Sequence, residues 1–128
     1  MDENVLYFGV YNSVLGVMLR REVGDFKYDV VSKQNKVNGR LRRLDYDVLV
    51  MEDLSERKVE ILRKANEKGI GSIVLVGEGL SEAFKKEAME LGAKVITVPI
   101  GADKWKEIIP EFSSSIENFI NRKYAQKN

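Results

Sequence analysis

Two adjacent carboxylates, Glu52 and Asp53, directly follow an apolar run at residues 48–51. Carboxylates at the end of a buried strand can act as catalytic groups, so this pair is the first candidate for chemistry. The alternative role is structural, because the pair stands where a buried strand meets water. Asp53 could also cap the helix predicted after it, with Glu56 three residues later completing a capping box. We prefer the structural role but keep both interpretations.

Ser13, at the end of the segment Tyr11-Asn12-Ser13, is a candidate nucleophile. A catalytic serine needs a neighbouring base to activate it. The sequence contains no histidine, and no lysine or aspartate partner is evident. We therefore expect Ser13 to be the N-cap of the helix that follows it.

The segment GEGLSE, residues 77–82, follows an apolar run and precedes a helical pattern, as a dinucleotide-binding fingerprint does. It contains only half of that fingerprint, because Glu82 stands at the position of the third glycine. Glu78 would also repel a pyrophosphate, and the next predicted strand ends without an acidic residue. We therefore do not predict nucleotide binding from this motif.

A basic segment, NGRLRRLD at residues 38–45, could form a patch together with Arg20 and Arg21. Nucleic-acid binding is favoured by a larger net charge than the +1 of this chain, and by aromatic stacking platforms. We expect a solvated helix face and no nucleic-acid partner. A DNA-binding role would instead predict salt-dependent binding that is lost when Arg40, Arg42 and Arg43 are neutralised.

The composition of the 128 residues is that of a globular protein, with 44% hydrophobic and 32% charged residues. The absence of cysteine excludes disulfides and thiol chemistry and fits a reducing compartment. No apolar run approaches the roughly 18 residues of a membrane span. The first residues are acidic, unlike a signal peptide. We expect a cytoplasmic protein with no membrane partner.

Short apolar runs alternate along the chain with helical patterns. The predicted strands are residues 5–10, 28–31, 48–51, 73–76 and 95–98. The predicted helices are 13–23, 35–44, 55–68, 81–91 and a last one from 103 to about 125. Ser13, Ser55 and Ser81 are candidate N-caps, and Gly69 and Gly92 are candidate helix stops. The residues expected to face the core are Val14, Leu15, Met18 and Leu19, then Val59, Ile61, Leu62 and Ala65, then Ala83, Phe84, Ala88, Met89 and Leu91.

Five β-α units predict an α/β fold with a doubly wound parallel sheet and one domain, residues 1–128. Apolar runs that do not alternate suit parallel strands covered on both faces, and the partly polar run 28–31 suits an edge strand. At this length the flavodoxin-like strand order 2-1-3-4-5 is the best prediction.

The last helix is predicted to be unusually long. Its apolar stripe consists of Trp105, Ile109, Phe112, Ile116 and Phe119. Pro110 interrupts the stripe, so we expect a kink or a second helix that begins there. The stripe either covers the core of this chain or binds a partner through its distal part.

Ligands of such sheets bind beyond the carboxyl ends of the strands, where the strand order reverses. The residues that this rule brings together are Tyr11, Asn12, Glu52, Asp53, Gly77, Val98 and Pro99. This candidate cleft includes the acidic pair.

The order of elements, together with two motifs, resembles the receiver domain of response regulators, the CheY-like superfamily. "YDVLVMED" is similar to the third strand of that family, which ends in the phosphoacceptor aspartate, and "LGAKVITVPI" is similar to its fourth helix, fifth strand and following proline. The resemblance covers almost the whole chain.

The positions that carry receiver chemistry are changed in this sequence. The resemblance puts Glu52 at the acceptor aspartate, and Gly9 and Val10 at the acidic pair that helps to bind Mg²⁺. The switch Ser/Thr falls on Gly77, and the lysine of the fifth loop falls on Val98. The chain therefore resembles a degenerate receiver, a pseudo-receiver.

Without the acidic pair of the first loop, one or two carboxylates make a poor cage for Mg²⁺. Glu52 also reaches about 1.5 Å further than an aspartate, and a misplacement of about 1 Å can cost on the order of 10²-fold in rate. We therefore expect no phosphotransfer, no metal and no cofactor. Glu52 could imitate a permanently charged acceptor or simply end a strand.

The first functional hypothesis is a non-catalytic signalling module that binds an unidentified protein. The resemblance implies a homodimer through helix 81–91, strand 95–98 and the last helix. Its apolar anchors would be Trp105, Ile109, Phe112, Ile116 and Phe119. The alternative is a small-molecule or nucleotide-binding flavodoxin-like module, whose cleft would lie between Tyr11, Asn12, Glu52 and Gly77.

Overall fold

The computed structural model describes residues 4–9, 13–43, 45–53, 56–78 and 82–127. The strands are β1 (Asn4–Phe8), β2 (Lys27–Val31), β3 (Val48–Glu52), β4 (Gly71–Gly77) and β5 (Lys94–Val98). The α-helices are α1 (Val14–Glu22), α2 (Gln34–Arg43), α3 (Glu56–Glu67), α4 (Glu82–Glu90) and α5 (Ile109–Lys127), and the 3₁₀ helix η1 (Ala102–Ile108) precedes α5.

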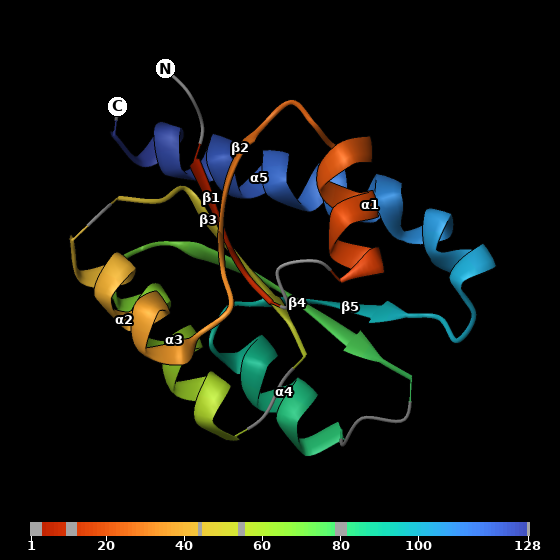
Figure 1. Ribbon diagram of the computed structural model, residues 1–128. Coiled ribbons are helices and arrows are strands. Elements are labelled where there is room, and N and C mark those ends of the chain that lie inside the picture. The colour runs from red at the N-terminus through yellow and green to blue at the C-terminus, as the bar shows by residue number, and fades with distance from the viewer. Residues whose placement is uncertain (1–3, 10–12, 44, 54–55, 79–81, 128) are drawn as a thin grey trace.

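Within these residues the strands form one parallel sheet in the order β2-β1-β3-β4-β5. Figure 1 shows the sheet between two helical layers, with α1 and α5 on one side and α2, α3 and α4 on the other. The predicted flavodoxin-like α/β fold and strand order are confirmed, and β2 is an edge strand as expected. No helix in the described ranges is both long enough and apolar enough to cross a membrane.

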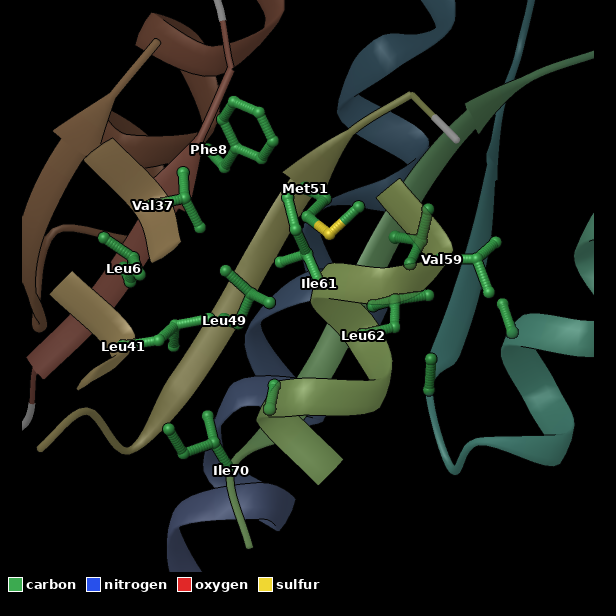
Figure 2. Close-up of a cluster of buried hydrophobic side chains, with 14 of the residues drawn as sticks. Leu6, Phe8, Val37, Leu41, Leu49, Met51, Val59, Ile61, Leu62 and Ile70 are labelled. Carbon is green, nitrogen blue, oxygen red and sulfur yellow. The ribbon is translucent and has the colours of Figure 1, made fainter. Parts of the chain in front are cut away.

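Each face of the sheet has its own hydrophobic core, because successive strand residues point to opposite faces. Leu6, Leu49 and Met51 face α2, α3 and α4. Figure 2 shows that strand side chains and those of α2 and α3 point toward one another in this core. Tyr7, Val50 and their equivalents face α1 and α5. Double coverage explains why the strands are apolar without alternation.

Local signals set most helix ends. Gly69 and Gly92 have positive φ angles, +74° and +82°, and follow α3 and α4 as predicted. After α4, the Ala93 N–H donates to the Ala88 carbonyl and the Gly92 N–H to Met89, which is a Schellman motif. Ser13 is the N-cap of α1. The other two predicted caps, Ser55 and Ser81, lie outside the described residues.

The predicted inward faces of the helices are largely confirmed but wrong at three positions. Val59, Ile61, Leu62 and Ala65 of α3 are all buried. Val14 at the start of α1 is 71% exposed, Met89 of α4 is 62% exposed, and Ala83 is also exposed. Both α1 and α4 are only nine residues long, so a small rotation decides which of two flanking apolar residues is covered.

The last helical segment consists of two helices, as the proline predicted. The 3₁₀ helix η1 ends at Ile108, and Pro110 is the second residue of α5, where its missing N–H costs no hydrogen bond. The main chain at Ile109 is helical, so the two helices are continuous.

The predicted partner-binding stripe is instead part of the core of this chain. Phe112 and Ile116 are fully buried, Phe119 is 9% exposed, and Trp105 and Ile109 pack against the same core. Phe112, Ile116 and Phe119 are therefore covered by the sheet, whereas partner binding through the partly buried Trp105 and Ile109 stays a prediction. The alternative, in which the stripe covers the core, is correct.

Phe119 of α5 packs closely against Gly71 of β4. A methyl group added at Gly71 would lie 2.2 Å from a ring carbon of Phe119. Glycine at the start of β4 therefore lets the aromatic ring lie flat on the main chain of the strand.

We predict that Gly71→Ala lowers the free energy of unfolding by about 1–3 kcal/mol, because the ring of Phe119 must move. Chemical denaturation monitored by circular dichroism measures this change. Gly77→Ala at the other end of β4 is the matched control, since a methyl group there meets no atom within 4 Å. Its stability should change by less than about 0.5 kcal/mol. Equal effects of the two substitutions would contradict the close contact.

Candidate functional site

The carboxyl edge of the sheet brings Gly9 and Glu52 together. Phe8 pairs with Met51 in the parallel register, which places the next residues, Gly9 and Glu52, opposite each other. Glu52 follows Val48 and Val50 in the alternation, so its side chain points to the α1 and α5 face. A methyl group at Gly9 would lie 2.0 Å from Oε1 of Glu52. The Glu52 carboxylate therefore occupies the space that a side chain at residue 9 would need.

Ser13 binds this carboxylate at the start of α1. Its Oγ lies 3.0 Å from Oε1 and 2.7 Å from Oε2 of Glu52, and the hydroxyl donates its proton between them. The same Oγ accepts a hydrogen bond from the Gly16 N–H at 3.1 Å. One hydroxyl therefore caps α1 and connects it to the end of β3.

Gly16 leaves room for further polar groups beside this bond. The position of a methyl group at Gly16 lies 2.7 Å from Ser13 Oγ, 2.9 Å from Arg20 Nη1 and 2.9 Å from the Tyr7 hydroxyl. The Arg20 guanidinium also stacks over the Tyr7 ring, 4.6 Å from its centroid. We call Tyr7, Ser13, Arg20 and Glu52 the Glu52 cluster.

Tyr7 keeps its proton in this cluster. Burial raises the pKa of the Tyr7 hydroxyl well above its ordinary value, and the negative charge of Glu52 raises it further. Arg20 opposes this shift only in part. The hydroxyl is therefore a neutral hydrogen-bonding group at physiological pH and cannot serve as a base there.

A lysine from α3 reaches the same edge of the sheet. Lys58 Nζ donates to the backbone carbonyl of Glu52 at 3.0 Å and lies 5.2 Å from the centre of the Phe8 ring. It is 3.9 Å from Oδ2 of Asp53. This ammonium group fixes the main chain where β3 ends.

Asp53 is not the N-cap of α3. The helix begins at Glu56, two residues beyond the place where a cap at Asp53 would start it. The φ angle of Asp53 is +79°, which differs from the extended conformation of an N-cap. Its N–H donates to Leu75 at 2.7 Å, and its side chain is 69% exposed. The predicted capping box is therefore wrong, and Asp53 ends the strand in a left-handed turn.

The other predicted cleft residues divide into two groups. Gly77 and Val98 pair with each other at the ends of β4 and β5, on the same edge as Glu52. Val98 is buried in the core under α5, and the Pro99 carbonyl accepts a hydrogen bond from the Trp105 indole at 3.2 Å. Tyr11, Asn12 and Val10 lie outside the described residues.

Three residues of this edge were missed by the sequence analysis: Tyr7, Lys58 and the inward role of Arg20. Tyr7 gave no signal because it lies in an apolar strand. Its position two residues before Gly9 nevertheless puts Tyr7 and Gly9 on the same face of the sheet. Lys58 had a weak signal, as the first lysine in the helix after the acidic pair. Arg20 was assigned to a patch with Arg40, but α1 and α2 lie on opposite faces of the sheet. That grouping is wrong.

Within the described part of the chain, no group of three or more acidic, histidine or cysteine side chains is placed to bind a metal ion. The carboxylate of Glu52 already accepts the Ser13 hydroxyl and points to α1, while Asp53 points to solvent. The two adjacent carboxylates therefore do not converge on one point.

Comparisons with known proteins identify the fold. No protein-family model and no curated protein matches the sequence. Among solved structures, a CheY-like response regulator receiver domain protein from Methanospirillum hungatei has a TM-score of 0.72, 12% identity and coverage of 95% of this chain and 99% of its own. An orphan response regulator of H. pylori has a TM-score of 0.68, 19% identity and coverage of 89% and 96%.

A structure described as adenylate cyclase from Rhodopirellula baltica is also similar, with a TM-score of 0.68, 16% identity and coverage of 100% and 99%. Identities this low establish a shared fold and do not transfer an activity. The chain has the fold of CheY-like receiver domains over nearly its whole length.

We predict that Ser13 and Glu52 are energetically coupled. A double-mutant cycle with Ser13→Ala and Glu52→Ala should give a coupling of about 1 kcal/mol, because each substitution removes the same charge-assisted hydrogen bond. Urea denaturation of the four proteins measures it. The control cycle pairs Ser13→Ala with Asp53→Ala, and its coupling should be near zero. Additive effects in the first cycle would contradict the bond.

Proposed function

We propose that this chain is a receiver-like signalling module that is not phosphorylated and acts by binding another protein. The observation that carries the proposal is the position of the Glu52 carboxylate in the space beside Gly9. In the receiver family, an acidic side chain from this part of the chain helps to bind Mg²⁺. A side chain at residue 9 would collide with Glu52, so the metal-binding arrangement and the observed one exclude each other.

The lack of a lysine at the position where receivers have one supports the same proposal. Transfer to a carboxylate requires cations that neutralise the phosphoryl oxygens. Val98 stands at the position of the receiver lysine, and its side chain is buried in the core. Lys58 comes from another element and donates to the main chain of Glu52. It does not restore the missing lysine, because it is engaged in holding the strand end.

Glu52 takes a different role in this proposal. The Ser13 hydroxyl donates to its carboxylate, and the Tyr7 hydroxyl also interacts with it. The hydrogen bond from Ser13 to this carboxylate keeps α1 attached to β3. The module is then held in one state, and its surfaces carry the signal.

The proposed homodimer uses the surface of α4 and β5 in place of the buried stripe. A surface groove of about 670 Å³ lies there and includes the exposed Met89. Its lining combines both signs of charge with apolar atoms: Glu82, Lys85, Lys86, Met89, Glu90, Val95 and Thr97. A two-fold interface needs a surface that complements itself, and adjacent charges of both signs provide this. β5 is also an edge strand with unpaired main-chain groups.

The first test asks whether the chain accepts a phosphoryl group. After incubation with acetyl phosphate and Mg²⁺, intact-mass spectrometry should show no added phosphoryl group, because the cation-binding groups are missing. A phosphorylatable receiver treated in parallel is the positive control. Glu52→Asp should also stay unmodified, since a shorter acceptor does not rebuild the metal site. A phosphorylated species on Glu52 or Asp53 would overturn the proposed function.

The homodimer is tested separately by light scattering over a range of concentrations. We expect a mass that rises toward twice the chain mass of 14.6 kDa. Met89→Glu should reduce the dimer, because it places a charge in the apolar part of the groove. Val14→Glu is the matched control, since Val14 is 71% exposed on the opposite layer. A constant monomer mass would remove the homodimer but leave the phosphorylation result unaffected.

A further inference from the structure

Helix α2 carries an unusual concentration of positive charge. Lys33, Lys36, Arg40, Arg42 and Arg43 lie within eleven residues that contain no Asp or Glu. Since the net charge of the whole chain is only +1, the rest of the protein is net negative. Residues 33–43 at the β2 edge of the sheet are therefore a local excess of positive charge.

The helix also forms a surface groove of about 570 Å³. The groove is lined by Asn35, Lys36, Gly39, Arg40 and Arg42. Lys36 and Arg40 are four residues apart, so they stand on the same side of adjacent turns, about 6 Å apart along the axis.

One cation of the groove is held in place, and the others extend into solvent. Arg40 Nη1 lies 3.5 Å from Oδ2 of Asp29, which in turn accepts a hydrogen bond from the Tyr46 hydroxyl. Burial and this bond raise the pKa of Tyr46 to about 12, so the hydroxyl remains a donor. Lys36 and Arg42 are exposed, and the described side chains show no ion pair that neutralises either one. Two charges are thus available to a ligand beside one fixed guanidinium.

We propose that the α2 groove, defined by Asn35, Lys36, Gly39, Arg40 and Arg42, binds an acidic segment of a partner protein. If the partner segment is a helix, carboxylates four residues apart on it have the same spacing as Lys36 and Arg40. The Asn35 amide adds a hydrogen-bond donor at one end of the groove. The proposal rests on the proposed function and specifies a surface and a partner chemistry for it.

Nucleic acid fits the groove less well than a short acidic peptide does. None of the five residues that line it is aromatic, so unpaired bases have no stacking platform there. A duplex is wider than one helix and would also contact the net negative remainder of the chain. An acidic peptide touches the groove alone and avoids that repulsion.

The α2 groove is separate from the proposed homodimer surface. α2 packs at the β2 edge of the sheet and α4 at the β5 edge, with α3 between them (Figure 1). Both surfaces can therefore be occupied in the same molecule, and each can be altered without changing the other.

Fluorescence anisotropy with a labelled alanine-based helical peptide that carries a glutamate at every fourth position tests the proposal. The full chain should bind this probe, and binding should weaken as salt rises from about 0.05 to 0.2 M. The same peptide with glutamine in place of glutamate should bind at least about tenfold more weakly, because only the charges differ. Lys36→Glu/Arg42→Glu should weaken binding of the glutamate peptide to a similar extent.

Lys104→Glu/Lys106→Glu is the matched control, because it changes the net charge equally at exposed positions of η1. It should retain the binding of the parent chain, and circular dichroism should show that both double variants are folded. Equal losses in the two variants, or no binding of the glutamate peptide at low salt, would overturn the proposal. Tighter binding of a single-stranded or duplex oligonucleotide would also overturn it, in favour of nucleic acid. None of these results changes the outcome of the phosphorylation test.

Discussion

The hydrogen bond between Ser13 and Glu52 depends on glycine at two positions, 9 and 16. Gly9 leaves the space into which the Glu52 carboxylate folds, and Gly16 leaves the space in which Ser13, Arg20 and Tyr7 converge. A larger residue at either position would displace a charged or buried polar group. Such groups are costly to leave without compensation in a partly buried site. The polar groups of this edge therefore require a small residue at positions 9 and 16.

The Ser13–Glu52 hydrogen bond also bears on how this fold can exist without the phosphotransfer chemistry of receiver domains. The sheet is covered on both faces by apolar side chains, so its stability does not depend on a metal ion at the carboxyl edge. That edge could then change from binding a cation to an internal bond between a serine and a glutamate. A reactive acceptor must be reachable by its phosphodonor, whereas Glu52 is turned toward α1 and held there. The fold is therefore compatible with the proposed absence of phosphotransfer.

Much of the fold could be predicted because its signals are local. Continuous apolar runs, glycines after helices and a proline near the start of α5 each reflect the conformation of a few neighbouring residues. The opposition of Gly9 and Glu52 could have been anticipated from strand parity, but only with the register of β1 against β3, which is a tertiary property. Asp53 was misjudged because its left-handed turn depends on the bond from its N–H to Leu75 on the neighbouring strand. A pattern of apolar residues also cannot specify what covers it, which is why the sequence left open whether the stripe of Phe112, Ile116 and Phe119 covers the core or binds a partner.

The arrangement of charge suggests how a receiver-like fold can signal without a reaction. A phosphorylated receiver changes its surface when its acceptor is modified, whereas the proposed function gives this chain no such step. In the proposed function the signal depends on which partners are present, and the two edges of the sheet offer surfaces of different character. The groove of α2 at the β2 edge is lined by three cations and no carboxylate, and Asp29 orients its Arg40, which is why we propose an acidic partner there. The β5 edge has both signs and an exposed methionine, so it suits a surface like itself. A module with these two edges would bring an acidic partner to a second copy of the same chain, and this function needs a rigid scaffold and no chemical step.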